Sequence, residues 1–219
     1  MDIVALGPEP AGLTRGSVLA AARRIADVEG VDRLTMRRLA AELGVTPNAL
    51  YSYVPHKEGL LDALIDDLLG DIDPGDLADV DWREGLVRVM DSSRRLLLAH
   101  PQLVSVFLAR PGLGRNAARL GELTLGLLRR GGLEGEPAVE AFRVLLIYSL
   151  GFAAFQAPRI RLDSPERTQQ VEATFAGLPE ERFPEMRRLA GPLAAPTTDR
   201  LFHTGLRWLL DGISGRAGG

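Results

Sequence analysis

The sequence predicts an all-α protein with two parts, a small three-helix head containing a helix-turn-helix and a larger helical body. Three observations support this fold class. Ala, Leu, Arg and Glu, which favour helices, dominate the 219 residues, and β-branched runs are scarce. Apolar residues recur at helical spacing over long segments, and Gly and Pro fall mostly between those segments. Finally, 46% hydrophobic and 25% charged residues suit a globular protein with a sizeable core.

Four helices are predicted in the N-terminal part, which we place at residues 1–69. The N-capping candidates are Thr14, Thr35 and Thr46, because a threonine hydroxyl can accept a hydrogen bond from a free amide of the first turn. Glycine or proline ends the first three helices. The predicted helices cover residues 15–29, 36–43, 47–54 and 56–69.

A second domain is predicted over residues 70–219. Its first segment, GDIDPGDLADVD at residues 70–81, is acidic and rich in turn residues, so we place the domain joint there. Six prolines between residues 158 and 196 indicate loops and short helices. The longer helices are expected over residues 82–99, 101–110, 115–130, 137–157 and 197–213, which gives nine or ten helices in all.

Composition excludes several classes of protein. The absence of cysteine excludes a disulfide framework, a thiolate zinc site and a cysteine nucleophile. The N-terminus MDIVALGPEP lacks the basic region of a secretory signal, and no apolar run approaches the ~18 residues of a membrane span. We therefore expect a cytoplasmic protein with no membrane partner. No catalytic set assembles, because the three histidines are scattered and neither a G-x-S-x-G nor a phosphate-binding glycine loop is present.

The most informative stretch is residues 34–57, which has the pattern of a helix, a tight turn and a second helix. On a helical wheel of the second helix, Leu50 and Val54 point into the core. Asn48, Ala49 and Ser52 point away from it. Small hydrogen-bonding side chains on an exposed helix suit insertion into a major groove about 12 Å wide. The stretch therefore predicts a DNA-reading helix.

Local charge supports the same interpretation. The whole chain has a net charge of −3, which argues against nucleic-acid binding by its entire surface. Between Arg33 and Lys57, however, four basic residues face one acidic residue, a local net charge of +3. A positive footprint confined to one edge is what phosphate binding requires. Tyr51 and Tyr53, at the margins of the exposed face, can donate hydrogen bonds to phosphates.

This stretch resembles the DNA-binding domain of the TetR family of bacterial transcriptional regulators. The matching residues, 34–64, are LTMRRLAAELGVTPNALYSYVPHKEGLLDAL. The resemblance implies a recognition helix that starts near Pro47, a base contact by Arg37 and a phosphate contact by Lys57. His56 is expected to cap the fourth helix or contact phosphate. The candidate DNA-binding residues are Arg37, Thr46, Pro47, Asn48, Ala49, Tyr51, Ser52, Tyr53, His56 and Lys57.

The second half more weakly resembles the ligand-binding domain of the tetracycline-repressor branch. Those repressors hold a magnesium–drug complex with a His and a Thr just before an Arg-Pro pair, where this chain has Val106 and Ala109. We therefore expect no metal, no cofactor and a different, apolar small-molecule effector; an effector that is not a small molecule stays open as the alternative. The candidate pocket residues are Trp82, Met90, His100, Phe107, Arg110, Tyr148, Phe152 and Gln156. Aromatic residues at helical spacing more often belong to the core, and a histidine at a helix junction more often caps or packs, as His100 would. The two polar residues Arg110 and Gln156 can equally belong to a solvated edge.

Together these features predict a sequence-specific repressor that is not an enzyme and that leaves its operator when a ligand binds the body. A homodimer formed through the helices near 137–157 and 197–213 would present two recognition helices ~34–36 Å apart to a near-palindromic site in double-stranded DNA. Two alternatives stay open: a ligand-insensitive architectural DNA-binding protein, and a helical interaction protein whose helix-turn-helix no longer binds DNA.

Overall fold

The computed structural model describes residues 13–110, 114–160 and 162–217, so most of the leader expected at the N-terminus lies outside the described residues. The described part contains no strand, which confirms the all-α prediction. Its α-helices are α1 (Arg15–Glu29), α2 (Met36–Leu43), α3 (Pro47–Leu50), α4 (Lys57–Gly70), α5 (Trp82–Ala99), α6 (Val104–Ala109), α7 (Arg115–Arg130), α8 (Gly135–Ile160), α9 (Pro165–Ala176), α10 (Pro184–Arg188), α11 (Ala190–Ala194) and α12 (Asp199–Ala217). Two 3₁₀ helices, Val31–Arg33 and Pro101–Leu103, complete the described elements.

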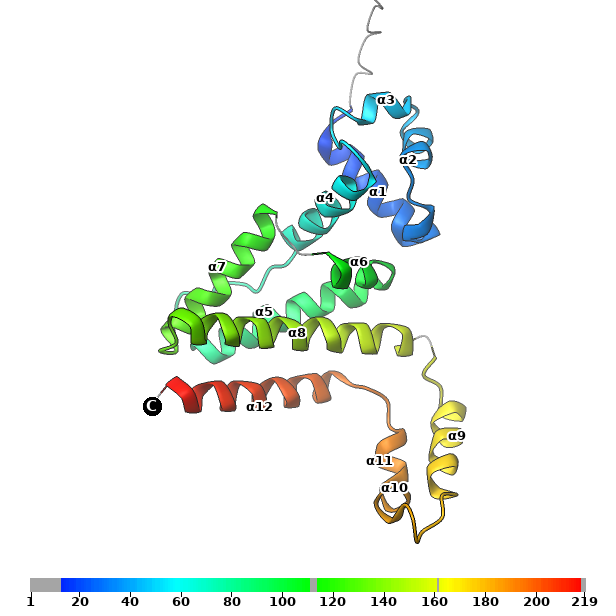
Figure 1. Ribbon diagram of the computed structural model, residues 1–219, viewed down its shortest axis with the longest axis vertical. Helices are drawn as coiled ribbons and strands as arrows, with labels where there is room; N and C mark the ends of the chain where they lie inside the picture. Colours follow the sequence, from blue (N-terminus) through cyan, green and yellow to red (C-terminus); the bar gives the residue numbers. More distant parts are fainter. Residues whose placement is uncertain (1–12, 111–113, 161, 218–219) are drawn as a thin grey trace, which may run out of the picture.

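The head consists of α1, α2 and α3, and α4 leads from it into the body (Figure 1). Thr14 and Thr35 cap α1 and α2 through their side chains, as predicted. Gly44 ends α2 in the left-handed region, with φ of 66°, and so allows the sharp turn into α3. Thr46 differs from the prediction, because its hydroxyl makes no capping bond and only its carbonyl accepts from Ala49 N, at 3.1 Å.

The third helix is shorter than the predicted 47–54. After Leu50 the chain continues in turns, and the amides of Tyr53 and Val54 both donate to the Leu50 carbonyl, each at 2.9 Å. Proline disfavours helical geometry in the residue before it, and Pro55 follows directly. The exposed face of this segment therefore combines one helical turn with a non-helical turn.

The body is built around α8, which packs on α5 and α7, while α12 packs on α8. A first cluster of buried apolar residues extends from the head through α4 to α6 and α8. A second joins α5, α7, α8 and α12. The first cluster is therefore continuous from the head to the body, with α4 between them.

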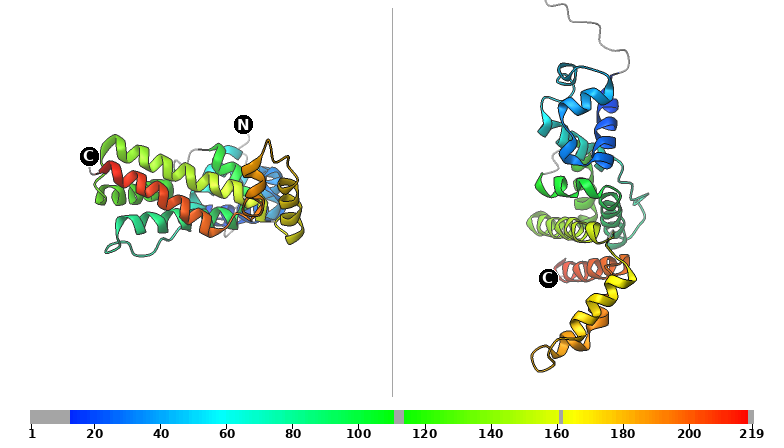
Figure 2. Two further views of the ribbon diagram at one scale, coloured as in Figure 1. Left: turned by 90° about the horizontal axis from the view of Figure 1, so that it is seen from below. Right: turned by 90° about the vertical axis from the view of Figure 1, so that its right-hand side faces the viewer.

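An arm formed by α9, α10 and α11 projects from the body at the end opposite the head (Figure 2). The loops and short helices predicted there are present, although α9 reaches 12 residues. Pro165 and Pro184 lie in the first turns of α9 and α10, where a backbone N–H has no acceptor within the helix, so proline, which has no N–H, loses no hydrogen bond there. These extra helices account for a total above the nine or ten predicted.

Helix α8 corrects one sequence-based expectation. It is 26 residues long and contains an 18-residue window of mean hydropathy 1.6, so by length and composition it qualifies as a membrane span. Its polar side chains serve the fold instead: Gln156 of α8 accepts a hydrogen bond from Arg94 of α5 at 2.7 Å. Only 28% of the window is buried within the chain, which leaves an apolar surface without a cover.

Candidate nucleic-acid interface and internal cavity

The outer face of residues 46–54, formed by α3 and the turn that follows it, has the composition and exposure that the helical wheel predicts. Leu50 and Val54 are buried in the first core cluster. Asn48 and Ser52 are exposed, and their side chains make no hydrogen bond with the described residues. Ala49 is half-buried between them. This face therefore has free hydrogen-bonding groups for an external partner. Thr46, Pro47 and Tyr51 are exposed at its margins.

Tyr53 does not have the free hydroxyl that phosphate binding requires. Its ring is half-buried against the first core cluster, and its hydroxyl donates to the backbone carbonyl of Leu13 at 2.9 Å. The bond fixes the start of α1 against the end of the recognition segment. Of the two tyrosines expected to donate to phosphates, Tyr51, at 50% exposure, is the one with an available hydroxyl.

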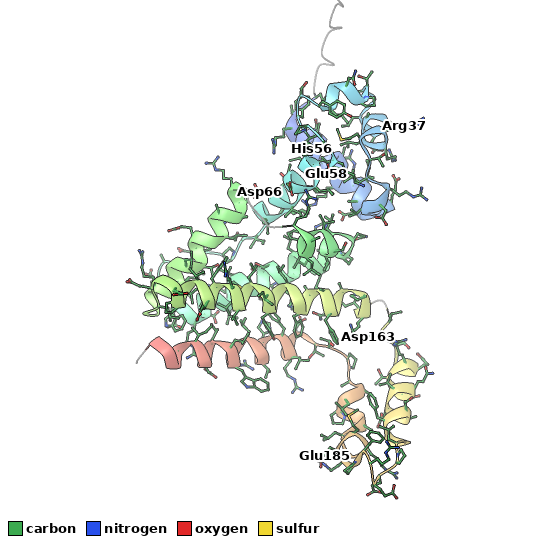
Figure 3. The ribbon with its side chains drawn as sticks, viewed as in Figure 1. Arg37, His56, Glu58, Asp66, Asp163 and Glu185 are labelled. Atoms are coloured by element: carbon green, nitrogen blue, oxygen red, sulfur yellow. The ribbon has the colours of Figure 1, made fainter. Side chains whose placement is uncertain are left out.

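The local positive charge is smaller than the count along the sequence suggested. Arg38 is held by Glu29 at 2.5 Å and by Glu42 at 2.9 Å. The hydrogen bond from Arg38 lowers the pKa of Glu29, and the same bond raises the pKa of Arg38. Glu29 precedes the stretch in which charge was counted. Arg37 and Lys57 form no ion pair within the described residues and remain available for DNA; Figure 3 labels Arg37 on α2.

His56 is the N-cap of α4, as expected. Its Nδ1 accepts a hydrogen bond from Gly59 N at 3.0 Å, and the ring is exposed. A neutral imidazole that accepts at Nδ1 carries its proton on Nε2, where it can donate to a phosphate. Lys57 follows in the first turn of the same helix. The start of α4 thus adds cationic and hydrogen-bond-donating groups to the surface formed by α2 and α3.

Further along α4, two carboxylates bind the wall of the body. Asp62 accepts from Arg110 Nε at 2.6 Å and from Arg110 Nη2 at 3.1 Å, and the bonded guanidinium lowers the pKa of Asp62. Asp66 Oδ1 accepts from the backbone amides of Asn116 and Ala117, at 2.9 and 3.0 Å. These amides open α7, whose N-cap Gly114 has no side chain to bond them. Asp66 therefore caps α7 from another helix.

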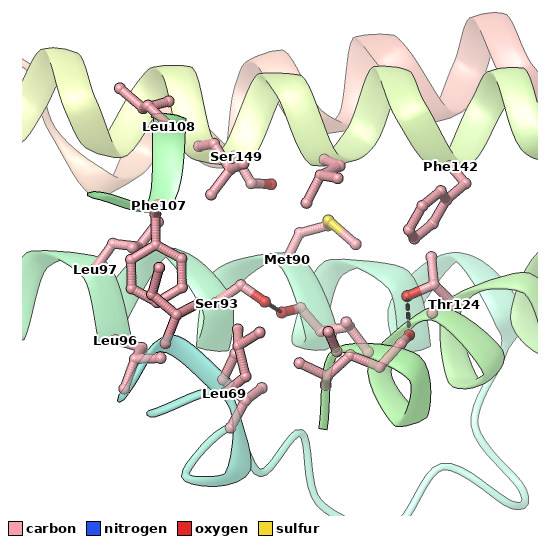
Figure 4. A pocket seen from close by; sticks show the side chains of 18 of the residues that line it. Leu69, Met90, Ser93, Leu96, Leu97, Phe107, Leu108, Thr124, Phe142 and Ser149 are labelled. Atoms are coloured by element: carbon pink, nitrogen blue, oxygen red, sulfur yellow. Dashed lines mark hydrogen bonds between the residues drawn. The ribbon is translucent and has the colours of Figure 1, made fainter. Parts of the chain in front are cut away.

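An internal cavity of about 450 Å³ lies between α4, α5, α6, α7 and α8 (Figure 4). Its wall includes three of the eight predicted pocket residues, Met90, Phe107 and Arg110. Most of the remaining wall is aliphatic. The further lining residues are Ile65, Leu69, Ile72, Val89, Ser93, Leu96, Leu97, Leu108, Ala109, Ala117, Leu120, Gly121, Thr124, Phe142, Leu146, Ser149 and Leu150.

The structure places the other five predicted pocket residues outside this cavity. Tyr148 and Phe152 lie on the side of α8 that faces α12: the Tyr148 hydroxyl donates to the Phe202 carbonyl at 2.8 Å, and the Phe152 and Phe202 rings meet edge to face. Gln156 binds Arg94, as above, and the Thr197 carbonyl. A helix presents different residues to each neighbour, and the sequence did not indicate which side of α8 faced the cavity.

Trp82 and His100 have separate surroundings. Trp82 packs so closely on Gly131 that a Cβ there would approach the indole ring to 2.5 Å. His100 lies where the end of α5 meets α1: its Nδ1 is 2.9 Å from Asp27 Oδ1, and its Nε2 is 2.9 Å from Arg23 Nη2. His100 is thus a packing and hydrogen-bonding residue between head and body, which was the alternative role considered for it.

Ser93, Thr124 and Ser149 line the cavity but were not among the predicted pocket residues, which were mostly aromatic or long polar side chains. The available signal was the presence of hydroxyl groups on the apolar stripes of their helices. Asp66 was also missed. The signal for it was Gly114, which stands at the N-cap position of α7 and has no side chain to accept a hydrogen bond. The first amides of α7 therefore need an acceptor from another element. Within the described residues, no group of three or more His, Asp or Glu is placed to hold a metal ion.

The uncovered apolar surface of the body spans α8 and α12, the two helices predicted to form a dimer interface. Ile147 on α8 is 69% exposed and Trp208 on α12 is 71% exposed. Val144 and Trp208 line a largely apolar groove between the two helices, with a volume of about 530 Å³. Large exposed apolar patches on a water-soluble fold commonly mark protein–protein contacts.

Comparisons with known proteins agree with both halves of the structure. Residues 18–64 match the family described as bacterial regulatory proteins, tetR family, and residues 74–216 match the family described as tetracyclin repressor-like, C-terminal domain. The transcriptional repressor DrrR1 of Streptomyces coeruleorubidus is 36% identical over 94% of this chain and 79% of that protein.

Two solved structures extend the likeness to the fold. ActR of Streptomyces coelicolor in complex with actinorhodin has a TM-score of 0.87 and 33% identity, covering 95% of this chain and 100% of that one. BioQ with its double-stranded DNA operator has a TM-score of 0.67 and 30% identity, covering 92% of this chain and 98% of that one.

Proposed function

The chain belongs to the TetR family of bacterial transcriptional regulators, and we propose that it is a cytoplasmic homodimeric repressor that leaves its operator when a small ligand occupies the internal cavity. The domain division at residues 69 and 70 is part of this proposal. The single observation that carries it is structural. The cavity wall is bonded to α4, and the same helix begins on the surface that carries Arg37 and the exposed face of α3.

In the DNA-bound state, the outer face of α3 would lie in the major groove. Asn48 can pair with adenine through both its carbonyl and its amide group, and Ala49 can touch a thymine methyl. Arg37 would contact a base, whereas Lys57, His56 and the Tyr51 hydroxyl would contact phosphates. Thr46, Pro47 and Ser52 complete the surface. Tyr53 keeps a supporting role through its bond to the backbone.

Dimerisation would position two such surfaces on one duplex. Each head reads only a few base pairs, so high specificity requires two heads about 34–36 Å apart. The exposed apolar surface of α8 and α12 can supply a self-complementary interface between protomers. DrrR1 is named a repressor, and BioQ was solved on its operator, which supports the same assignment for this chain.

Ligand release follows from linkage between the cavity and α4. A ligand that fits best when α6 and the start of α7 have moved would favour that arrangement by its difference in affinity for the two states. Arg110 and Ala117 both line the cavity and both contact α4, through Asp62 and Asp66. Their displacement would shift α4 and change the separation of the two heads. Allosteric couplings of this kind are typically about 1–3 kcal/mol.

Salt-dependent footprinting on the DNA upstream of the gene tests the proposal. A specific repressor protects a near-palindrome. An architectural protein would retard all sequences alike, and a pure interaction module would retard none. Arg37→Ala should lose about 1–3 kcal/mol of binding at specific positions, and Lys57→Ala should weaken binding to every sequence and flatten the salt dependence. Arg167→Ala, which removes an exposed arginine from α9, is the matched control and should bind as the parent does.

A further inference from the structure

The cavity contains a buried hydroxyl that lacks a hydrogen-bond partner. Ser149 on α8 is 1% exposed, and its Oγ forms no hydrogen bond with any described residue. Figure 4 shows this side chain in the cavity wall across from α5 and α7. A buried hydroxyl is normally bonded, and a serine in a helix has the carbonyl four residues earlier within reach. Ser149 does not use that carbonyl, and it lines the cavity, so a molecule in the cavity is the natural source of the missing partner.

Two further hydroxyl groups in the cavity wall, unlike that of Ser149, donate to backbone carbonyls. Ser93 Oγ donates to the Val89 carbonyl at 2.8 Å, and Thr124 Oγ1 donates to the Leu120 carbonyl at 2.7 Å. Each hydroxyl proton is thereby used, but each oxygen keeps lone pairs that can accept. A ligand with hydroxyl groups can donate to these oxygens, while an acceptor or donor on the ligand can bond Ser149.

The charge of the cavity wall is positive. None of the lining residues is acidic, and Arg110 is the charged residue among them. Its Nε and Nη2 are bonded to Asp62 and to the Glu58 carbonyl, whereas its Nη1 has no partner in the described part of the chain. The neighbouring Asp66 carboxylate is bonded to the start of α7. A cation in the cavity would meet apolar surface and a guanidinium with no carboxylate to pair with, which is costly.

We infer that the cavity takes uncharged or anionic ring compounds that carry hydroxyl or carbonyl oxygens, and that it discriminates against cationic compounds of the same shape. The inference rests on the proposed function and deepens it, because it assigns a chemical class to the effector. A volume of about 450 Å³ lies within the usual range for drug-sized ligands. Aromatic and aliphatic walls would hold the rings, and the three hydroxyls and Arg110 Nη1 would orient the oxygens.

A matched set of fluorescent probes tests charge selectivity. 9-Anthracenemethanol is neutral, anthracene-9-carboxylate is anionic, and 9-(aminomethyl)anthracene is cationic at pH 7, and the three share one ring system. Fluorescence titration of the full-length protein should show the first two binding at least tenfold more tightly than the third. Equal or tighter binding of the ammonium compound would overturn the inference, and so would failure of all three to bind up to their solubility limits.

Substitutions locate the probe and test the hydroxyl. Ser149→Ala removes the unpartnered oxygen and should weaken binding of 9-anthracenemethanol about threefold to tenfold, without lowering the melting temperature. Gly121 lines the cavity, and a Cβ there would meet open space, so Gly121→Leu should fill the cavity and abolish binding. Gly126 lies on the same helix away from the cavity, and a Cβ there is equally free, so Gly126→Leu is the control. Unchanged affinity in both Ser149→Ala and Gly121→Leu would contradict the assigned site.

Operator affinity, measured separately by fluorescence anisotropy, distinguishes the failure of this inference from the failure of the proposed function. A protein that binds its operator but prefers the cationic probe refutes the ligand class and leaves the repressor assignment standing. A protein that shows the expected probe selectivity but never changes its operator affinity refutes ligand-induced release and leaves the ligand class standing.

Discussion

Replacing Asp66 tests whether α4 and the cavity wall are joined as the structure indicates. The carboxylate accepts two backbone hydrogen bonds at the start of α7, and Asp66→Ala removes both while leaving the two amides without an acceptor. Loss of a helix cap costs about 1 kcal/mol, and loss of a negative charge at a helix N-terminus costs about 0.3–1 kcal/mol. We therefore expect Asp66→Ala to lower the free energy of unfolding by about 1–2 kcal/mol.

Two further variants separate the contributions. Asp66→Asn keeps an oxygen acceptor but removes the charge, so it should lose about 0.3–1 kcal/mol. Asp67→Ala changes the next residue, which is exposed and has no partner within the described residues, and should stay within about 0.5 kcal/mol of the parent. The bond from Asn116 Nδ2 to the Asp66 carbonyl is retained in every variant.

Urea unfolding followed by circular dichroism at 222 nm measures these differences, at one protein concentration because a dimer's stability depends on it. If 9-anthracenemethanol lowers operator affinity, the factor by which it does so should be smaller in Asp66→Ala. In that variant one of the two bonded contacts between the cavity wall and α4, that of Asp66 with the start of α7, is lost. If Asp66→Ala is as stable as Asp67→Ala and its response to the probe is unchanged, the reasoning about α4 is refuted.

The remaining predictions concern other parts of the molecule. Tyr53→Phe removes the hydrogen bond to the Leu13 carbonyl and should lower the free energy of unfolding by about 0.5–1.5 kcal/mol in urea, with operator affinity unchanged. A loss of operator affinity would indicate that the Tyr53 hydroxyl contacts phosphate. Trp208→Asp places a charge on the apolar groove and should yield monomers in analytical ultracentrifugation, whereas a persistent dimer would exclude that face. Arg110 lowers the pKa of Asp62, so the contribution of the pair is present above the usual carboxyl pKa of about 3.9 and is lost as pH falls through the lower folded-state pKa. The stability difference between the parent and Asp62→Asn should therefore be constant from about pH 8 to pH 5 and vanish only in strong acid; a difference that disappears near pH 6 would contradict the pairing.

Local periodicity was sufficient to predict most of the fold. The burial of Leu50 follows from helical spacing, and Val54 is buried as predicted although α3 ends at Leu50. Capping threonines and glycines placed the ends of α1 and α2, and the predicted bounds of α5 and α7 also agree with the structure. The boundaries of α8 were less accurate, because Pro158 was expected to stop the helix and instead lies within its last turn. Proline near a helix end removes few bonds, so the terminus depends on tertiary packing.

The site was predictable only where it depends on one helix. Tyr53 has the composition of a phosphate donor, but its partner Leu13 is 40 residues away. Arg38 adds to the local charge count, yet Glu29, outside the counted stretch, holds it. Tyr148 and Phe152 have the chemistry of pocket residues, but they lie on the side of α8 that packs against α12, where both contact Phe202. In each case the deciding contact joins segments whose proximity no local pattern reveals.

The central requirement is that the exposed face of α3 reads base pairs. The most direct measurement compares the affinity of the parent protein and Asn48→Ala for the footprinted sequence and for a scrambled duplex of equal length, at one salt concentration. We predict that the parent prefers its site at least about 10³-fold and that Asn48→Ala loses part of that preference while keeping its affinity for the scrambled duplex. Equal affinity of the parent for both duplexes would contradict the assignment.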